Sequence, residues 1–404
     1  MEKIQVSARK CDSYDNDILI PVLKQCLSDI GGFKELIKPG LKILLKPNLL
    51  SPNPPEKAIT THPLFVEAVI KIITEITKDP GNIIIADSCV PIYPHTKKGL
   101  KKLYEKTGLI NIPERTGASL NYDNSQKKIN ISEGISIRQV EIMKPVFEAD
   151  IIINLPKFKT HNLTIMTGAV KNMFGIIPGM AKPGLHTSFF EVDKFSDMLL
   201  DVAYAMKPQI NIMDGILGMQ GNGPGNGGVP ISTNIVLASK DAISLDNIVS
   251  FMMDIDISSN PVMLQAQKRN FNGSSIDQIE VLGSNLNDLK LNDFLLPDTK
   301  NKDLSSGAQK NKIIKTFLNF AKNSLNPYPF INTGKCTKCD TCFNICPANA
   351  IRSANEIKNP LKFDYSKCIK CFCCAEACPE GAIDNRYNFI GNLIINRYSL
   401  GKKK

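Results

Sequence analysis

Long apolar runs are missing from this sequence. No stretch approaches the roughly 20 consecutive apolar residues that a helix needs to cross a bilayer. The first residues, MEKIQVSARKCDSYD, also lack the apolar segment that follows the basic residues of a secretory leader. We therefore expect no transmembrane segment and a cytoplasmic location.

Signatures of nucleotide cofactors are missing as well. The stretch 214–230 contains seven glycines, yet it matches neither the phosphate-loop pattern nor the dinucleotide fingerprint. Its backbone N–H groups are still suited to cradling an anionic group. No flavin, nicotinamide or molybdenum signature is visible, so we expect none of these cofactors.

Cysteine is scarce except in one segment. Nine of the twelve cysteines lie between Cys336 and Cys378, at intervals of mostly two or three residues. Disulfide frameworks rarely pack cysteines so densely, whereas metal clusters require it. The pattern favours a reducing cytoplasm, typical of an anaerobe or of a cell with anaerobic metabolism.

The cysteines form two repeats of the pattern C-x2-C-x2-C-x3-C-P. In each repeat, three cysteines wrap three corners of a cubane, and the fourth points away to complete the other cluster. We therefore predict two [4Fe–4S] clusters, a pattern that resembles the bacterial-type two-cluster ferredoxin. The predicted ligands are Cys336, Cys339, Cys342 and Cys378 for cluster 1, and Cys368, Cys371, Cys374 and Cys346 for cluster 2. Zinc, which needs only four ligands per site, has no use for the crossed fourth cysteine.

Cys373 lies inside the second repeat and is surplus to the eight ligands. It is either a small buried residue or a redox-active or alternative ligand.

The formal net charge is +10. Two such clusters, each with four thiolates, would carry about −2 apiece and lower the total to roughly +6. Part of this excess comes from Lys402, Lys403 and Lys404 at the end of the chain. A nucleic-acid partner is therefore only weakly indicated.

Apolar runs alternate with amphipathic segments along the first 295 residues, which predicts an α/β layered domain with a mainly parallel sheet. Expected helices cover 17–30 and 63–78, the second capped by Thr60 or Thr61. The predicted organisation is an α/β domain over 1–295, a linker with a short helix over 296–326, a small α+β cluster domain over 327–385 and a basic tail over 386–404. The expected buried strands are 41–45, 83–86, 151–153, 210–213 and 235–238.

Polar residues follow four of these strands, and the carboxyl ends of parallel strands form the usual ligand crevice. We predict that Asp87, His161, His186 and Asp214 are catalytic. The predicted substrate-binding residues are Lys46, Asn48, Lys157, Lys159, Lys171 and Asn172. Each also has a purely structural interpretation: solvated loop lysines, helix-capping aspartates and hydrogen-bonded structural histidines.

Six segments resemble the DUF362 family in the order that the family has them, over about Leu41 to Asp246. They are LLKPNLL at 44–50, TTHP at 60–63, ADS at 86–88, the run 154–175, DGILGMQGNGP at 214–224 and SKDAISLD at 239–246. This resemblance implies a fold and a fusion to a ferredoxin-type domain, and it supplies no catalytic residues. A more remote similarity to the lactate racemase family implies an α/β domain that binds a small organic acid or cofactor.

Three functions are compatible with these features. The leading hypothesis is a ferredoxin-linked iron–sulfur oxidoreductase that passes electrons to a small anionic substrate in the α/β crevice. The second is an electron-transfer adaptor that docks a partner redox enzyme, and the third is a non-redox enzyme with structural clusters. An enclosed crevice with apolar walls would favour the first, and an open basic face the second.

Overall fold

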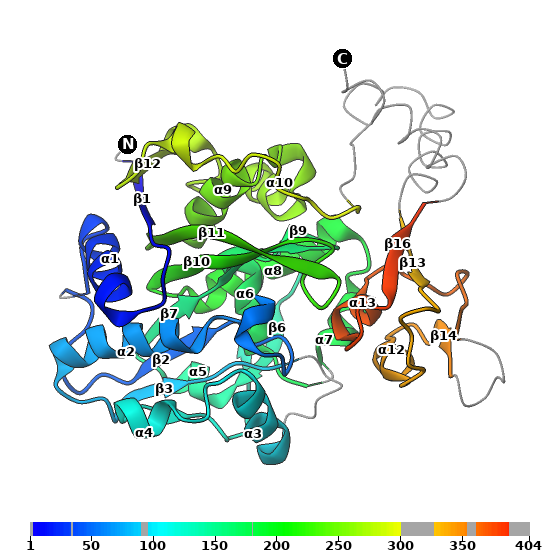
Figure 1. The fold of residues 1–404 in the computed structure, drawn as a ribbon, viewed down its shortest axis with the longest axis horizontal. Coiled ribbons are helices and arrows are strands. Elements are labelled where there is room, and N and C mark those ends of the chain that lie inside the picture. Colours follow the sequence, from blue (N-terminus) through cyan, green and yellow to red (C-terminus); the bar gives the residue numbers. More distant parts are fainter. Residues whose placement is uncertain are drawn as a thin grey trace.

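The computed structural model describes residues 3–33, 35–89, 96–179, 181–299, 327–353 and 361–387. A large helix-covered sheet forms one part, and the cysteine repeats form a smaller part beside it (Figure 1). Most of the predicted linker over 296–326, with its helix, lies outside the described residues, as does most of the basic tail over 386–404.

The main sheet is mixed, with mostly parallel neighbours, in the order β12-β1-β11-β10-β7-β2-β3-β4. Only β11 is antiparallel to both of its neighbours along this order, and β8 and β9 branch from β10. The strands are β1 (Ile4–Lys10), β2 (Ile43–Pro47), β3 (Ile83–Ile85), β4 (Ser119–Leu120), β7 (Ile151–Leu155), β8 (Lys157–His161), β9 (Ile165–Met166), β10 (Ile210–Gly221), β11 (Gly228–Ser239) and β12 (Ile279–Leu282). The predicted α/β class with a mainly parallel sheet is confirmed.

The continuous apolar runs exist because both faces of the central strands are buried. Ile43 and Leu45 pack into one core cluster, while Leu44 between them packs into the cluster on the opposite face. Successive side chains of a strand point to opposite faces, so a strand covered on both sides must be apolar throughout.

Helices cover both faces of this sheet (Figure 1). Residues of α1 and α2 belong to one core cluster, and residues of α8, α9 and α10 belong to the other. The helices are α1 (Asn16–Asp29), α2 (Pro63–Thr77), α3 (Lys97–Lys106), α4 (Ile112–Thr116), α5 (Lys144–Glu148), α6 (Gly168–Asn172), α7 (Ala181–Ser188), α8 (Val192–Met206), α9 (Ala242–Met252) and α10 (Pro261–Lys268). A separate hairpin joins β5 (Gln126–Asn130) to β6 (Gln139–Met143).

The cap of α2 differs from the expectation. The side chain of His62 accepts a hydrogen bond from Leu64 N at 3.3 Å, in the position expected for Thr60 or Thr61. Thr61 instead donates its hydroxyl to Leu155 O at 2.7 Å, which ties the start of α2 to β7.

The cluster domain repeats its own backbone at an offset of 32 residues. Each repeat ends in a five-residue helix, α12 (Thr341–Ile345) or α13 (Cys373–Ala377). The residues flanking the second cysteine are left-handed in both repeats, with φ of 58° and 56° at Lys338 and Asp340 and of 56° and 59° at Lys370 and Phe372. Two small antiparallel sheets of two strands each complete the domain: β13 (Tyr328–Ile331) with β16 (Ile383–Arg386), and β14 (Ile351–Arg352) with β15 (Lys362–Phe363).

Candidate functional site

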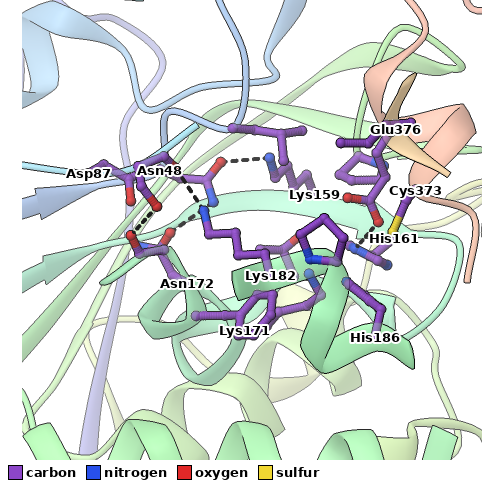
Figure 2. Close-up of a pocket in the computed structure, with 18 residues that line it drawn as sticks. Asn48, Asp87, Lys159, His161, Lys171, Asn172, Lys182, His186, Cys373 and Glu376 are labelled. Carbon is purple, nitrogen blue, oxygen red and sulfur yellow. Dashed lines mark hydrogen bonds and ion pairs between the residues drawn. The ribbon is translucent and has the colours of Figure 1, made fainter. Parts of the chain in front are cut away.

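A cavity lies where the carboxyl ends of the sheet strands meet the cluster domain. Its volume is about 660 Å³, including the space at its mouth. The sheet side and α7 contribute its charged residues, and Ile345, Cys373 and Glu376 of the cluster domain close it (Figure 2). Apolar side chains such as Leu50 and Phe174 line the rest. The cavity is thus a site shared by both domains.

A chain of buried polar side chains forms one wall of the cavity. Lys46 donates to Asp87 at 2.7 Å and to Asn172 at 3.3 Å. Asn48 donates to Asn172 at 2.8 Å and accepts from Lys159 at 2.6 Å (Figure 2). Burial lowers the pKa of Lys46, and the neighbouring Asp87 carboxylate opposes that shift. The wall is therefore a rigid network whose members hold one another in place.

Three lysines bring positive charge to the cavity without a carboxylate partner of their own. Lys159 has only neutral acceptors, Asn48 Oδ1 and Ile59 O at 2.7 Å. Lys182 donates to the carbonyls of Ser88 at 3.0 Å and Cys89 at 3.4 Å. Burial lowers the pKa of Lys159 and brings that of Lys182 to about 8.

Of the three lysines, Lys171 has the fewest polar partners among the described residues. It is only 9% exposed and lines the cavity. Its ammonium lies 5.7 Å from the centre of the Phe174 ring but has no hydrogen-bond or ion-pair partner among the described residues. Burial lowers its pKa, although the charge of Glu376 works against this shift. A buried, unpaired ammonium is costly, so this group is suited to an anionic ligand.

His161 joins the two domains through Glu376. Its Nε2 lies 2.9 Å from Glu376 Oε1, a close contact that falls short of hydrogen-bond alignment. Its Nδ1 accepts the backbone N–H groups of Leu163 at 3.0 Å and Thr164 at 3.3 Å, which places the proton of the neutral ring on Nε2. Burial and Lys171 lower the pKa of His161 to about 4. Burial disfavours the charged form of Glu376, but the contact with His161 and the charge of Lys171 outweigh it and lower its pKa.

His186 lines the same cavity from α7. Its ring stacks on Phe195 with centroids 4.3 Å apart and meets Phe174 edge-on at 5.8 Å. Burial lowers its pKa to about 3, so the ring is neutral at pH 7. The stacking fixes the ring, and no described group hydrogen-bonds to its nitrogens.

Lys157 and Asp214 do not line the cavity. They form a fully buried ion pair at 2.7 Å, which the hydroxyl of Tyr14 joins at 3.1 and 2.8 Å. Asp214 also accepts from the backbone N–H of His62 at 2.9 Å. Lys46 likewise lies behind the wall. The structure thus brings seven of the ten predicted crevice residues to the cavity: Asn48, Asp87, Lys159, His161, Lys171, Asn172 and His186.

Asp246 anchors the helix that carries Lys171 and Asn172. Its carboxylate accepts from the backbone N–H groups of Ala169 at 2.5 Å and Val170 at 3.0 Å. Gly168, at φ +64°, leaves room for this carboxylate, because a Cβ at that position would collide with it. This contact gives the SKDAISLD segment a structural role at the site.

The glycine-rich hairpin between β10 and β11 contacts the cluster domain rather than lying open to a small anion. A Cβ on Gly225 would come within 2.7 Å of Glu376 O, and one on Gly381 within 2.5 Å of Asn226 O. Asn385 donates to Asn162 and to Asn222, each at 3.1 Å. Glycine at these positions therefore permits the close approach of the two domains.

The residues of the two repeats fit the predicted clusters. Beyond burial, the thiols of Cys378, Cys336 and Cys339 raise the pKa of Cys342 to about 12, so these four sulfurs lie near one another. Cys371 and Cys346 act in the same way on Cys368. The crossed cysteines also accept backbone N–H groups, Cys346 from Ala350 and Cys378 from Ala382, each at 3.2 Å.

A mononuclear metal fits these cysteines poorly. In a tetrahedral zinc site the ligand sulfurs are roughly 3.8 Å apart, whereas the corners of a cubane hold them farther apart. Within the described ranges, no three His, Cys, Asp or Glu side chains converge closely enough to hold one ion. Two sets of four cysteines would suit two cubanes, with the predicted ligands named above.

Cys373 lies between cluster 2 and the cavity. Its thiol lowers the pKa of Cys371, one of the predicted ligands, and its side chain lines the cavity. Sequence reasoning identified Cys373 as surplus but not its position, and it missed Lys182 and Glu376 altogether. For Glu376 a signal existed: it follows a cluster ligand by two residues and replaces the exposed Asn344 of the first repeat.

The sequence matches two family models. The model of the domain of unknown function DUF362 matches residues 43–250, just over half of the chain, and that of a 4Fe–4S dicluster domain matches 328–379. The described residues include no helix with the length and apolarity needed to span a bilayer.

Two individual proteins are similar to the chain. The thylakoid-associated protein sll1697 of Synechocystis sp. is 29% identical over 294 residues, which are 72% of this chain and 88% of that protein. The lactate racemase apoprotein from Thermoanaerobacterium thermosaccharolyticum superposes with a TM-score of 0.39 and 16% identity, over 63% of this chain and 58% of that one. The chain thus spans less than two thirds of the racemase.

Proposed function

The chain belongs to the DUF362 family and carries a 4Fe–4S ferredoxin-type domain, and on this basis we propose that it is an iron–sulfur oxidoreductase that reduces a small anionic substrate. The observation that carries the proposal is the shared cavity. Cys373, next to the predicted ligand Cys374, lines the same space as the unpaired ammonium of Lys171. Clusters held by the eight cysteines would supply single electrons next to this space.

The cavity supports an enzyme better than an adaptor. An adaptor needs an open docking face, whereas this cavity is a recess lined by both domains and has apolar residues among its charged ones. The proposal includes a cytoplasmic location, anaerobic metabolism and a redox partner such as ferredoxin.

Anion binding would fall to the lysines, and proton transfer to the histidines. Lys159, Lys171 and Lys182 attract an anion, and a bound anion in turn favours their charged forms. His161 is neutral at pH 7, and a bound anion favours its charged form; that imidazolium is able to donate a proton as the substrate gains electrons. A two-electron reduction needs two protons, and His186 is the second neutral imidazole at the cavity.

Anaerobic purification from the native cell, followed by mass spectrometry of released small molecules, tests the proposal. We expect an anionic compound with wild-type protein and its loss with Lys171→Met, which keeps the length of the side chain but not its charge. Lys194→Met, at an exposed position of α8, is the matched control. No bound anion, or equal recovery from Lys171→Met, would contradict the proposal.

A further inference from the structure

The two cysteine repeats are equivalent in sequence but differ in what covers them. At the offset of 32 residues, Phe343 corresponds to Ala375 and Cys339 to Cys371. Ala375 is buried, and Cys371 packs with Leu50 of the α/β domain. Phe343 is 36% exposed, and Cys339 is the one exposed cysteine in the described part of the chain. The second repeat is thus docked on the cavity through several residues, whereas the first repeat reaches it through Ile345 and leaves Cys339 and Phe343 exposed.

The exposed counterpart has the features of a docking surface. Lys335 and Lys338 flank the first cysteine of the repeat, and both are exposed. Neither lysine has an ion pair with a described residue. An exposed aromatic side chain beside unpaired cations combines an apolar contact with a charged rim. We call residues 335–343 the donor face.

We propose that the donor face receives a small acidic electron-carrier protein, so that electrons arrive at the first repeat and leave from the second. This inference rests on the proposed function in one respect, namely that electrons move through the domain. In each transfer the carrier loses one electron and the cluster domain gains one, with no bond made or broken. The two lysines complement an acidic carrier and would speed its encounter with this face.

Burial of the second repeat supports this direction. Cys373 and Glu376 of the second repeat line the cavity. The side chain of the hairpin residue Asn226 donates a hydrogen bond to Cys378 O at 3.5 Å. A protein carrier cannot reach Cys373 or Glu376 without displacing the α/β domain. Lys335, Lys338, Cys339 and Phe343 of the first repeat are exposed and open to a carrier.

Stopped-flow reduction of the anaerobic full-length protein by a purified, reduced, acidic two-cluster ferredoxin tests the proposal. The rate is read from the visible absorbance of the clusters, without substrate. We expect the double variant Lys335→Glu/Lys338→Glu to be reduced about tenfold more slowly at low ionic strength. At high ionic strength the rates should agree within about twofold, because salt screens exposed charges.

The double variant Arg352→Glu/Lys362→Glu is the matched control. These residues pair across β14 and β15, are exposed, and give the same change of charge in the same domain. We expect it to resemble wild type, and Phe343→Ser to weaken binding of the oxidised ferredoxin in a direct binding assay. Reduction by dithionite should be equal in all variants, which shows that their clusters are intact.

Equal slowing of both charge reversals, or no slowing of either, would overturn the donor face. Because no substrate is present, this failure is distinct from failure of the proposed function. If the reduction rates of the variants are as expected but no anion is bound in the cavity, only the proposed function is contradicted.

Discussion

At the scale of single residues, burial and partners separate the functional side chains from structural ones. Lys157 and Lys171 are both buried lysines near a sheet edge, but Lys157 has a carboxylate at 2.7 Å and Lys171 has no ion-pair partner in the described part of the chain. From the sequence, both lysines are equally good candidates for a substrate-binding role. Only the fold decides which one is left with an unpaired charge, so this difference was beyond sequence reasoning.

Cys373 is the residue whose role is most directly testable. Cys373→Ser should leave iron content unchanged, whereas Cys374→Ser should lose or convert one cluster, because Cys374 is a predicted ligand. Cys373→Ala removes the neighbouring thiol that lowers the pKa of Cys371 and should lower the potential of that cluster, because a neighbour that stabilises the ligand thiolate also favours the reduced state. Iron analysis and redox titration check both. Equal loss of iron in Cys373→Ser and Cys374→Ser would mean that the ligands are misassigned.

His62 predicts a dependence of stability on pH. Burial lowers its pKa to about 4, and its side chain caps α2, where a positive charge opposes the helix dipole. Between pH 6.5 and 4 the unfolded chain therefore binds the proton and the folded chain does not. The free energy of unfolding should fall by roughly 2–3 kcal/mol as the pH drops through this range.

His62→Asn retains a capping side chain without a titrating group. Denaturant unfolding of both proteins across this pH range measures the difference, in which contributions from other groups cancel. Between pH 6.5 and 4, the free energy of unfolding of His62→Asn should fall by roughly 2–3 kcal/mol less than that of the wild-type protein. Parallel curves for the two proteins would contradict the assignment.

At the scale of elements, the sequence predicted the buried strands and the two long helices well, because apolar periodicity reports burial locally. The predicted strand over 210–213 begins where β10 begins, but β10 continues to Gly221. Its extension forms the glycine-rich hairpin, for which we expected an anion-cradling loop. Glycine permits several kinds of close approach, and the local sequence does not show that the approaching group is another domain.

This hairpin gives a prediction of its own. Gly225→Ala places a Cβ 2.7 Å from the backbone of Glu376 and should lower the free energy of unfolding by about 1–3 kcal/mol. It should also increase hydrogen exchange in residues 371–378 while leaving iron content unchanged. Gly334→Ala, where the nearest atom is 3.4 Å away, is the control. Equal exchange in both variants would show that the hairpin does not hold the domains together.

At the scale of the whole molecule, the cluster domain should be fully loaded when the protein is made without oxygen. We expect about eight iron and eight sulfide per chain, because two sets of four cysteines suit two cubanes. Metal and sulfide analysis of anaerobically purified protein measures this directly. About two zinc and no labile sulfide would end the ferredoxin-type interpretation.

The sequence predicted both domains but not their joint site. The spacing of the cysteines and the order of the family segments are local properties and could be read directly. The position of Glu376 beside His161, 215 residues away in the chain, depends on how two separately folded surfaces meet. No pattern within either segment contains that information.

The shared wall of the cavity links the site to the supply of iron. The described cluster domain has a core of few residues that includes Cys342, Cys374 and Cys378, with Cys336 and Cys346 packed against it, so we expect its folding to depend on the metal. Without folded α13, the ammonium groups of Lys159 and Lys171 would face water and lose the low-dielectric surroundings that make them selective. Under the proposed function, a cell starved of iron would therefore make a chain that cannot hold its anionic ligand, and it would not sequester a metabolite that it had no electrons to reduce.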